Sequence, residues 1–521
     1  MDTKALRQKI LDLAIRGKLV PQDPNDEPAS VLLERIREQK QQMVKDGKLK
    51  KKDIKNDSVI FVGEDNLHYE KSADGSVKCI EDEIPFELPE GWAWTRLGCI
   101  TDVIQYGLSN SAESTGDYRL LRITDIQNGC VNWDAVPFTY TDEPEKYLLH
   151  KDDIVFARTG ATVGKSFLIT DLPYVSVYAS YLIRIRLING ISANYIYHFF
   201  NSYCYWEQVT DKSVGVGQPN CNGTALKELF IPLPSQAEQN RIVPVADNLL
   251  KIADVITSER ESLSELIQTT NSKILDLAIR GKLVPQNPDD EPASVLLERI
   301  RAEKETLIKQ GKIKRDKKES IIFKGEDNSY YVRQDTHTEA IDEQFIFELP
   351  DNWEWCSLLN IAKMELGKTL DSAKNTGINY PYLRSVNVRW NDVDLSDLKE
   401  MRFEPEELER YTVRLNDLLI CEGGDVGRSC VWTDDKEILY QNALHRVRFY
   451  GECNPFYFMY YMMYYESLGI IKALCKGVTI KHLTGNVLSL IPFALPPIKE
   501  QSRIVEKLNQ IFTLIDCIIS D

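Results

Sequence analysis

The stretch KILDLAIRGKLVPQDPNDEPASVLLERIR, Lys9–Arg37, decides the fold because it occurs twice. It returns as KILDLAIRGKLVPQNPDDEPASVLLERIR over Lys273–Arg301, and only positions 23/287 and 25/289 differ. Self-similarity over a long interval indicates that one structural unit has been duplicated. Weaker echoes pair SVIFVGEDN (Ser58–Asn66) with SIIFKGEDN (Ser320–Asn328), FELPEGWAW (Phe86–Trp94) with FELPDNWEW (Phe347–Trp355), and LLRITDI (Leu120–Ile126) with YLRSVNV (Tyr382–Val388).

The two copies are cut at different places. IPLPSQAEQNRIV (Ile231–Val243) runs on into the second KILDLAIRGK within one central segment. Its echo FALPPIKEQSRIV (Phe493–Val505) instead lies near the end of the chain, whereas the first KILDLAIRGK opens it. If the copies fold alike, the N-terminal piece completes what the C-terminal piece begins, so the chain ends lie side by side. We therefore expect a circular organisation with a pseudo-twofold axis.

The central segment has the pattern of a long helix. A heptad of apolar positions runs through it, at Ile242, Leu249, Ile256, Leu263, Thr270 and Leu277. Such a repeat predicts a helix of about 36 residues, or roughly 50 Å, whose apolar stripe packs on a partner helix. Ser235 and Glu238 fit a capping box at its start. Pro244 should bend this helix or mark its true beginning.

Between the helical parts lie two blocks, residues 58–234 and 320–497, that are rich in Tyr, Val, Ile and Trp. This composition predicts compact, mixed, mostly β domains. The apolar-aromatic runs at 194–200 and 454–463 are each expected to form a core helix. The fold class is therefore α+β: two similar mostly β domains separated by an antiparallel two-helix coiled coil.

The composition suits a soluble protein. Of its 521 residues 43% are apolar, no window approaches the run of about 20 apolar residues that a membrane span needs, and the N-terminus does not resemble a signal peptide. Eleven cysteines without a C-x-x-C pair indicate reduced thiols, so we expect a cytoplasmic protein. The net charge of −16 disfavours general nucleic-acid affinity but permits local basic surfaces. Two basic runs, at 45–55 and 309–318, stand out, and their role is open.

RTGATVGKS, Arg158–Ser166, resembles a nucleotide-binding loop but has three residues between its glycines, where that loop needs four. The matching stretch EGGDVGRS (Glu422–Ser429) is shorter and replaces the lysine with arginine. Both copies preserve an upstream aspartate (Asp153, Asp417), a strand, a tight glycine turn and one cation. The pattern indicates a scaffold that presents a positive charge, and it disfavours nucleotide binding.

Other catalytic patterns are missing too. The sequence contains no H-E-x-x-H, no G-x-S-x-G, no methyltransferase motif and no histidines at ligand spacing. The acidic PNDEP and PDDEP repeats fit a turn before helices that begin at Ser30 and Ser294. We therefore expect no catalytic residue, no metal and no bound cofactor.

Two similar but non-identical domains on a rigid helical rod match the twofold symmetry of duplex DNA. The frames of the two blocks agree while their loops diverge, as in QYGLSNSAESTG (105–116) against ELGKTLDSAKNTG (365–377). This pattern predicts two different half-sites and an asymmetric, split target. With the domains one helical turn apart, the half-sites would be centred about 10 bp from each other.

The whole chain resembles the DNA specificity subunit of type I restriction–modification enzymes. The resemblance rests on the LPxxxEQxRIV junctions (Leu233–Val243, Leu495–Val505), the KILDLAIRGKLVPQ repeat, the two glycine turns and the LLRITDI segment. It implies a conserved helical half-repeat at 1–45, target-recognition domains at 46–235 and 309–497, each with a basic insertion, a central helical region at 236–308 and a C-terminal helix at 498–521.

The resemblance also implies partners: double-stranded DNA, methyltransferase subunits, two of them on the symmetry of the chain, and a restriction–translocation subunit. Adenine methylation and ATP-driven cleavage, with S-adenosylmethionine, ATP and Mg²⁺, would then belong to those partners and not to this chain. Two alternatives are a specificity subunit of a methyltransferase without a restriction partner and a coiled-coil scaffold that binds proteins. The helical faces at 249–277 and 504–518 are expected to carry the methyltransferase docking.

Candidate DNA contacts follow from residue type, since Arg and Lys contact phosphates and guanines while Asn, Gln, Ser and Thr read adenine edges or phosphates. In the first domain they are Arg122, Arg158, Thr159, Lys165, Lys212, Gln218 and Asn220. In the second domain they are Lys368, Arg384, Arg389, Arg428, Lys476, Lys481 and His482.

Overall fold

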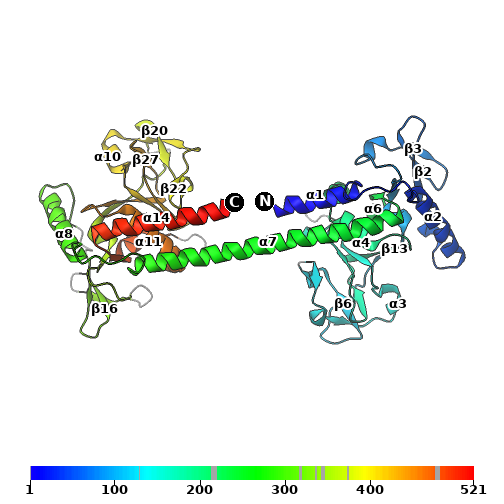
Figure 1. Cartoon of the computed structure of the whole chain (residues 1–521), viewed down its shortest axis with the longest axis horizontal. Coiled ribbons are helices and arrows are strands. Elements are labelled where there is room, and N and C mark those ends of the chain that lie inside the picture. The colour runs from blue at the N-terminus through cyan, green and yellow to red at the C-terminus, as the bar shows by residue number, and fades with distance from the viewer. Residues whose placement is uncertain are drawn as a thin grey trace. The chain divides into compact units, whose positions relative to one another are not determined.

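The computed structural model describes residues 2–127, 129–212, 220–315, 320–334, 337–341, 347–371, 375–475 and 482–520. The chain divides into two compact units, Met1–Glu261 and Ser262–Asp521. Figure 1 labels several of their elements. Helix α7 (Gln236–Ile279) contributes residues to both units.

The first unit combines helices with small sheets. Its other helices are α1 (Thr3–Ile15), α2 (Ala29–Lys45), α3 (Pro144–Tyr147), α4 (Ala193–Phe200), α5 (Tyr203–Lys212) and α6 (Gly223–Lys227). Its strands are β1 (Ser58–Val62), β2 (His68–Ser72), β3 (Val77–Cys79), β4 (Ala93–Arg96), β5 (Thr101–Tyr106), β6 (Tyr118–Leu121), β7 (Ile126–Gln127), β8 (Cys130–Val131), β9 (Phe138–Thr139), β10 (Ile154–Ala157), β11 (Ser166–Leu168), β12 (Ser176–Tyr178), β13 (Leu182–Leu187) and β14 (Phe230–Leu233).

The second unit repeats this plan. Its helices are α8 (Ala293–Lys309), α9 (Leu358–Ile361), α10 (Leu408–Tyr411), α11 (Pro455–Ser467), α12 (Ile470–Leu474), α13 (Gly485–Leu490) and α14 (Ile498–Ser520). Its strands are β15 (Ser320–Lys324), β16 (Tyr330–Gln334), β17 (His337–Ala340), β18 (Glu354–Ser357), β19 (Ala362–Leu366), β20 (Ile378–Leu383), β21 (Val388–Arg389), β22 (Asp392–Val393), β23 (Lys399–Phe403), β24 (Thr412–Val413), β25 (Leu418–Cys421), β26 (Ser429–Val431), β27 (Ile438–Tyr440), β28 (Leu444–Phe449) and β29 (Pro492–Leu495).

The sheets of the two units have matching topologies. A four-stranded antiparallel sheet has the order β11-β10-β13-β5 in the first unit and β26-β25-β28-β19 in the second. A second sheet in each unit contains one parallel pair, β6 with β12 and β20 with β27, in which Leu120 pairs with Val177 and Tyr382 with Leu439. The two domains are therefore built on one frame, and the predicted mixed, mostly β architecture is confirmed.

The apolar-aromatic runs form core helices, as predicted. In α4 the side chains of Tyr195, Phe199 and Phe200 are buried, and the hydroxyl of Ser192 caps the helix by accepting from the Tyr195 amide at 3.3 Å. Helix α11 begins in the same way, because the side chain of Asn454 accepts from the Phe456 amide at 3.0 Å. Most of the aromatic rings of the two runs therefore pack in the interior.

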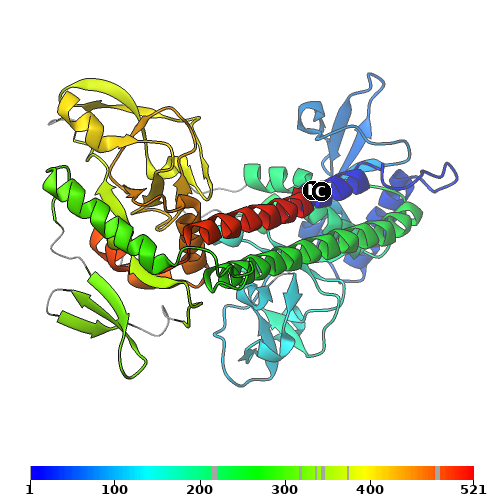
Figure 2. The same cartoon turned by 60° about the vertical axis from the view of Figure 1, so that its left-hand side comes forward.

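Two helices of the first unit run antiparallel. Arg7, near the start of α1, forms an ion pair with Asp254 of α7. Ala14 and Ile15, at the end of α1, share a buried core with Ile242, which comes earlier in α7. The two helices therefore run in opposite directions. In the second unit α14 lies alongside the C-terminal part of α7 (Figures 1 and 2). Leu275 and Ile279 of α7 share one buried core there with Ile504 and Leu508 of α14.

Helix α7 starts directly after Ser235, as the predicted capping box implied, but it is longer than predicted. It has 44 residues and starts at Gln236, so Pro244 lies inside the helix and does not mark its beginning. Only half of the predicted capping box forms: the Glu238 amide donates to the Ser235 hydroxyl at 3.0 Å, but the Glu238 carboxylate is used elsewhere. It accepts from the indole of Trp92 at 2.8 Å and from the amide of Gln22 at 3.1 Å.

The same three-residue contact recurs in the second unit. Glu500 accepts from Trp353 at 3.0 Å and from Gln286 at 2.6 Å. Glu238 and Glu500 are almost fully buried, and this burial raises the pKa of both carboxyl groups. The glutamate of each EQ junction therefore links two parts of its unit by hydrogen bonds: the glutamine of the KLVPQ repeat and a buried tryptophan, Trp92 or Trp353.

The glutamine of each junction has an equally defined role. The side-chain oxygen of Gln239 accepts from the Ser192 amide at 2.8 Å, and that of Gln501 accepts from the Asn454 amide at 2.8 Å. Ser192 and Asn454 are the capping residues of the two core helices. The EQ pair thus ties the helical segment to the centre of each domain.

We expect Trp353→Phe to lower the free energy of unfolding by about 1–3 kcal/mol, because it removes one of the donors of the buried Glu500 carboxylate. Trp355→Phe is the matched control: Trp355 is also buried, but its indole nitrogen has no hydrogen-bond partner among the described residues. Denaturant titration of both variants tests this. Equal losses would show that packing, and not the hydrogen bond, dominates.

Candidate nucleic-acid interface

The glycine turn of the first unit connects two antiparallel strands. Ala157 ends β10, and Ser166 begins β11, with Phe156 paired to Ser166. A nucleotide-binding loop instead leads from a strand into a helix, whose N-terminal amides surround the phosphates. Gly164 has a φ of 89°, and a Cβ there would lie 2.5 Å from the ring of Trp206. The turn is thus packed against α5 at Gly164, and it leads into a strand and not into the helix that a nucleotide-binding loop needs.

Four side chains gather where this turn meets the segment before α6. We call Tyr106, Arg158, Thr159 and Asn220 the first turn site. The carbonyl of Arg158 accepts from the Cys221 amide at 3.0 Å, and Thr159 forms a β-bridge with Asn220. The guanidinium carbon of Arg158 lies 4.8 Å from the centre of the Tyr106 ring.

The guanidinium of Arg158 is the main hydrogen-bond donor group of this site. Its Nε is buried and has no hydrogen-bond partner among the described residues. Tyr106 is held in place because its hydroxyl accepts from the Gly223 amide at 2.9 Å. A half-buried arginine that is stacked on an aromatic ring presents a preorganised fork of donors, which is the geometry that guanine edges and phosphates select.

The second unit has the corresponding site with other side chains. We call Glu422, Gly423, His445 and His482 the second turn site. The carbonyl of Glu422 accepts from the Leu483 amide at 2.9 Å, which repeats the bond between Arg158 and Cys221. His445 donates through Nε2 to the Leu483 carbonyl at 3.0 Å, and burial lowers its pKa. His482 is exposed beside Gly423.

The two turn sites therefore share backbone geometry and differ in chemistry. Glu422 takes the place of Arg158, and His482 takes that of Asn220. Leu366, which pairs with His445 as Tyr106 pairs with Ile183, takes the place of Tyr106. A carboxylate can accept from a cytosine amino group, a contact that a guanidinium cannot make. One scaffold that carries different donors and acceptors is what two different half-sites require.

Several predicted contact residues are already paired within the domain. Arg122 forms an ion pair with Asp125 at 2.7 Å, and Arg384 forms one with Asp397 at 2.8 Å. Arg428 pairs with Asp425 and donates to the Ser385 carbonyl. These three arginines brace the loops that flank the turns, so their charges are partly neutralised.

The remaining predicted residues divide by exposure. Lys165 and Arg389 are exposed, whereas Lys368 is buried with its ammonium paired to Glu407. Lys212 ends α5, and its side chain lies outside the described part of the structure. Gln218, Lys476 and Lys481 also lie outside the described residues.

The upstream aspartates form ion pairs beside the strands that lead into the turns. Asp153 is buried and accepts from Arg186 at 2.8 Å and from the His150 amide at 2.8 Å. Asp417 does the same with Arg448 at 2.7 Å. Sequence reasoning noticed these aspartates but missed Tyr106 and His445, which lie on strands whose alternating pattern gives no sign of a site.

The acidic repeats form ion pairs, not a metal site. Asp26 binds Arg241 at 2.6 Å, and this contact lowers the pKa of Asp26. Asp290 binds Arg503 at 2.6 Å in the second unit. The helices that follow begin at Ala29 and Ala293, one residue before the predicted starts.

No group of three or more His, Cys, Asp or Glu side chains in the described ranges is placed to hold a metal ion. No helix in the same part of the chain is long and apolar enough to cross a membrane.

Comparison with known proteins identifies the family. Residues 89–265 and 350–518 match the type I restriction modification DNA specificity domain, and these segments make up more than half of the chain. The EcoAI specificity subunit of Escherichia coli is 27% identical, with 98% of this chain and 88% of that protein covered. The EcoKI specificity subunit of Escherichia coli strain K12 is 24% identical, with 83% and 84% covered.

Two solved structures also resemble the chain. One, from work on complex assembly and conformational transition of the type I R-M system, has a TM-score of 0.46 at 16% identity, with 83% of this chain and 93% of that one covered. The HsdS subunit from Thermoanaerobacter tengcongensis has a TM-score of 0.39 at 17% identity, with 84% and 92% covered. The family match to both halves is decisive: the chain belongs to the DNA specificity proteins of type I restriction–modification systems.

Proposed function

We propose that each unit reads one half of a split, asymmetric DNA target and that the chain is a non-catalytic part of a site-specific adenine methyltransferase. The observation that carries this proposal is the pair of turn sites, which share a backbone frame and present different side chains. Equal side chains would favour a palindromic target, whereas arginine in one site and glutamate in the other favour unlike half-sites.

The partner assignment follows from the family. Methyltransferase subunits would supply the chemistry and their S-adenosylmethionine, and a restriction subunit would supply ATP- and Mg²⁺-dependent cleavage. A system with a methyltransferase alone is the second candidate. Assay of ATP-dependent cleavage by the complex purified from its host separates the two.

We expect the chain, together with its methyltransferase, to protect two separated patches of one duplex in a footprint. A genome-wide map of methylated adenines should show a split motif with unlike halves, whose centres lie about 10 bp apart if one helical turn separates the domains. Added nucleotide should leave the melting temperature of the isolated chain unchanged. Protection of a single continuous patch, or a palindromic motif, would contradict two unlike readers.

A further inference from the structure

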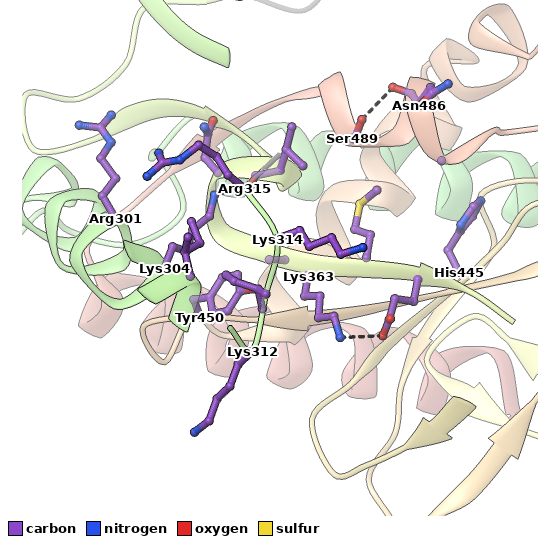
Figure 3. A pocket seen from close by; sticks show the side chains of 18 of the residues that line it. Arg301, Lys304, Lys312, Lys314, Arg315, Lys363, His445, Tyr450, Asn486 and Ser489 are labelled. Atoms are coloured by element: carbon purple, nitrogen blue, oxygen red, sulfur yellow. Dashed lines mark hydrogen bonds and ion pairs between the residues drawn. The ribbon is translucent and has the colours of Figure 1, made fainter. Parts of the chain in front are cut away.

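A large groove lies beside α8 in the second unit. It has a volume of about 1050 Å³. One side is formed by α8 and the basic run that follows it, and the other by β19 and the start of α13 (Figure 3). Residues 312–315 of the basic run therefore line this groove.

The groove is strongly cationic, although the chain as a whole is acidic. Among its lining residues are six cations, namely Arg301, Lys304, Lys312, Lys314, Arg315 and Lys363. Its two carboxylates, Glu305 and Glu365, each pair with one of these cations, at 2.7 Å to Arg315 and 3.1 Å to Lys363. A net positive groove on a chain with a formal charge of −16 selects a polyanion.

One of these lysines is structural. Lys304 donates to the carbonyl of Leu359 at 3.1 Å, and Lys40 makes the same contact with Gly98 at 2.8 Å in the first unit. Lys312 and Lys314 differ, because both are exposed and lie beyond the end of α8. Their side chains are therefore the natural choice for testing what the groove binds.

One residue of the second turn site, the buried His445, lines the groove. His445, Thr484 and Gly485 line its far end. Leu483, the residue before Thr484, donates to the carbonyl of Glu422 in the turn itself. A polyanion that occupies the groove would therefore lie within a few residues of the turn.

We infer that this groove binds the phosphate backbone of the DNA that flanks the half-site read by the second unit. The inference rests on the proposed function. Duplex DNA carries one phosphate per 3.4 Å of each strand, so a row of lysines and arginines can neutralise several phosphates without reading sequence. An acidic protein would satisfy the charge equally well, but it would not explain why the groove lies within a few residues of the turn.

The first unit provides a matched comparison. The groove beside α2 has a volume of about 320 Å³, is lined by Arg37, Lys40, Lys71 and Asp57 among others, and receives no side chain from Lys48 or Lys50. Lys48 and Lys50 occupy the places of Lys312 and Lys314 in the repeat. The same pair of substitutions can therefore be made inside and outside a basic groove.

The test measures DNA affinity of the full chain in complex with its methyltransferase across a series of NaCl concentrations, with a target duplex and a scrambled duplex. For Lys312→Gln/Lys314→Gln we expect the slope of log affinity against log salt to fall by about two, one for each lost phosphate contact. Both duplexes should weaken by the same factor, and the methylated sequence should not change. Lys48→Gln/Lys50→Gln should leave the slope unchanged.

Each other outcome overturns the inference. An unchanged slope in the Lys312/Lys314 variant would show that the groove does not contact phosphates and would favour a protein ligand. A changed methylated sequence would show that these lysines read bases. If the unmodified complex did not distinguish the two duplexes, the proposed function itself would fail, and this result is separate from any effect on the slope.

Discussion

Exchange of residues 58–234 for the matching block of another family member is expected to change one half of the DNA target and to leave the other half intact. The expected effect is complete, with a new half-site in place of the old one. The physical reason is that each unit has its own buried cores: residues 1–261 supply one set, and residues 262–521 supply the other.

The boundaries of this exchange follow from the strand pairing. β4 near the start of the block pairs antiparallel with β14 at its end, so the block closes on itself before α7 begins. The donor block must supply a tryptophan at position 92 and a capping residue at position 192, because these contact Glu238 and Gln239. Without them the junction would lose buried hydrogen bonds, and the exchange would fail for reasons of stability.

Methylation mapping of hosts that carry the exchanged chain provides the measurement. The reciprocal exchange of residues 320–497 is the control and should alter only the other half. A change in both halves after either exchange would refute independent reading by the two units.

The second large effect is expected at Arg158. We expect Arg158→Ala to weaken binding by about 1–3 kcal/mol, or about 5- to 150-fold, and to relax base preference within one half-site. The reason is that its half-buried guanidinium is stacked on Tyr106, which orients the fork of donors before DNA binds. Arg158→Lys keeps the charge but not the fork and should recover little of the loss.

Lys165→Gln is the control for this experiment. Lys165 is exposed on the same turn, so its loss should weaken all sequences equally and lower the salt slope by about one. Affinity for target and mismatched duplexes, measured side by side, distinguishes the two behaviours. If Arg158→Ala left both affinity and methylated sequence unchanged, the arginine would be only a surface residue of the turn.

The repeat explains why much of the architecture could be predicted. Near-identity between Lys9–Arg37 and Lys273–Arg301 implied one frame used twice, and the matching sheet orders confirm it. The period of the apolar residues located α7, and the aromatic runs located α4 and α11. The idea that the chain ends lie side by side stays a prediction.

The site was less predictable, since residue type does not reveal pairing. Arg384 and Lys368 have the chemistry of DNA contacts, yet Asp397 and Glu407 occupy their charges. Those acids lie 13 and 39 residues away along the chain, so only the fold brings them near. Tyr106 and His445 could not be predicted for the converse reason. In the sequence each is an ordinary strand residue, and only the fold places it next to a turn.

The hydrogen bonds of the EQ junctions have a consequence for how such proteins diversify. Glu238 with Gln239 and Glu500 with Gln501 hold their domains through the same atoms, to a tryptophan and to a helix cap. We expect a domain that carries these attachment points to fit either position in the chain. A set of such domains, combined two at a time, would then give a number of distinct target sequences that grows as the square of the number of domains. The helices that join the domains would not need to change.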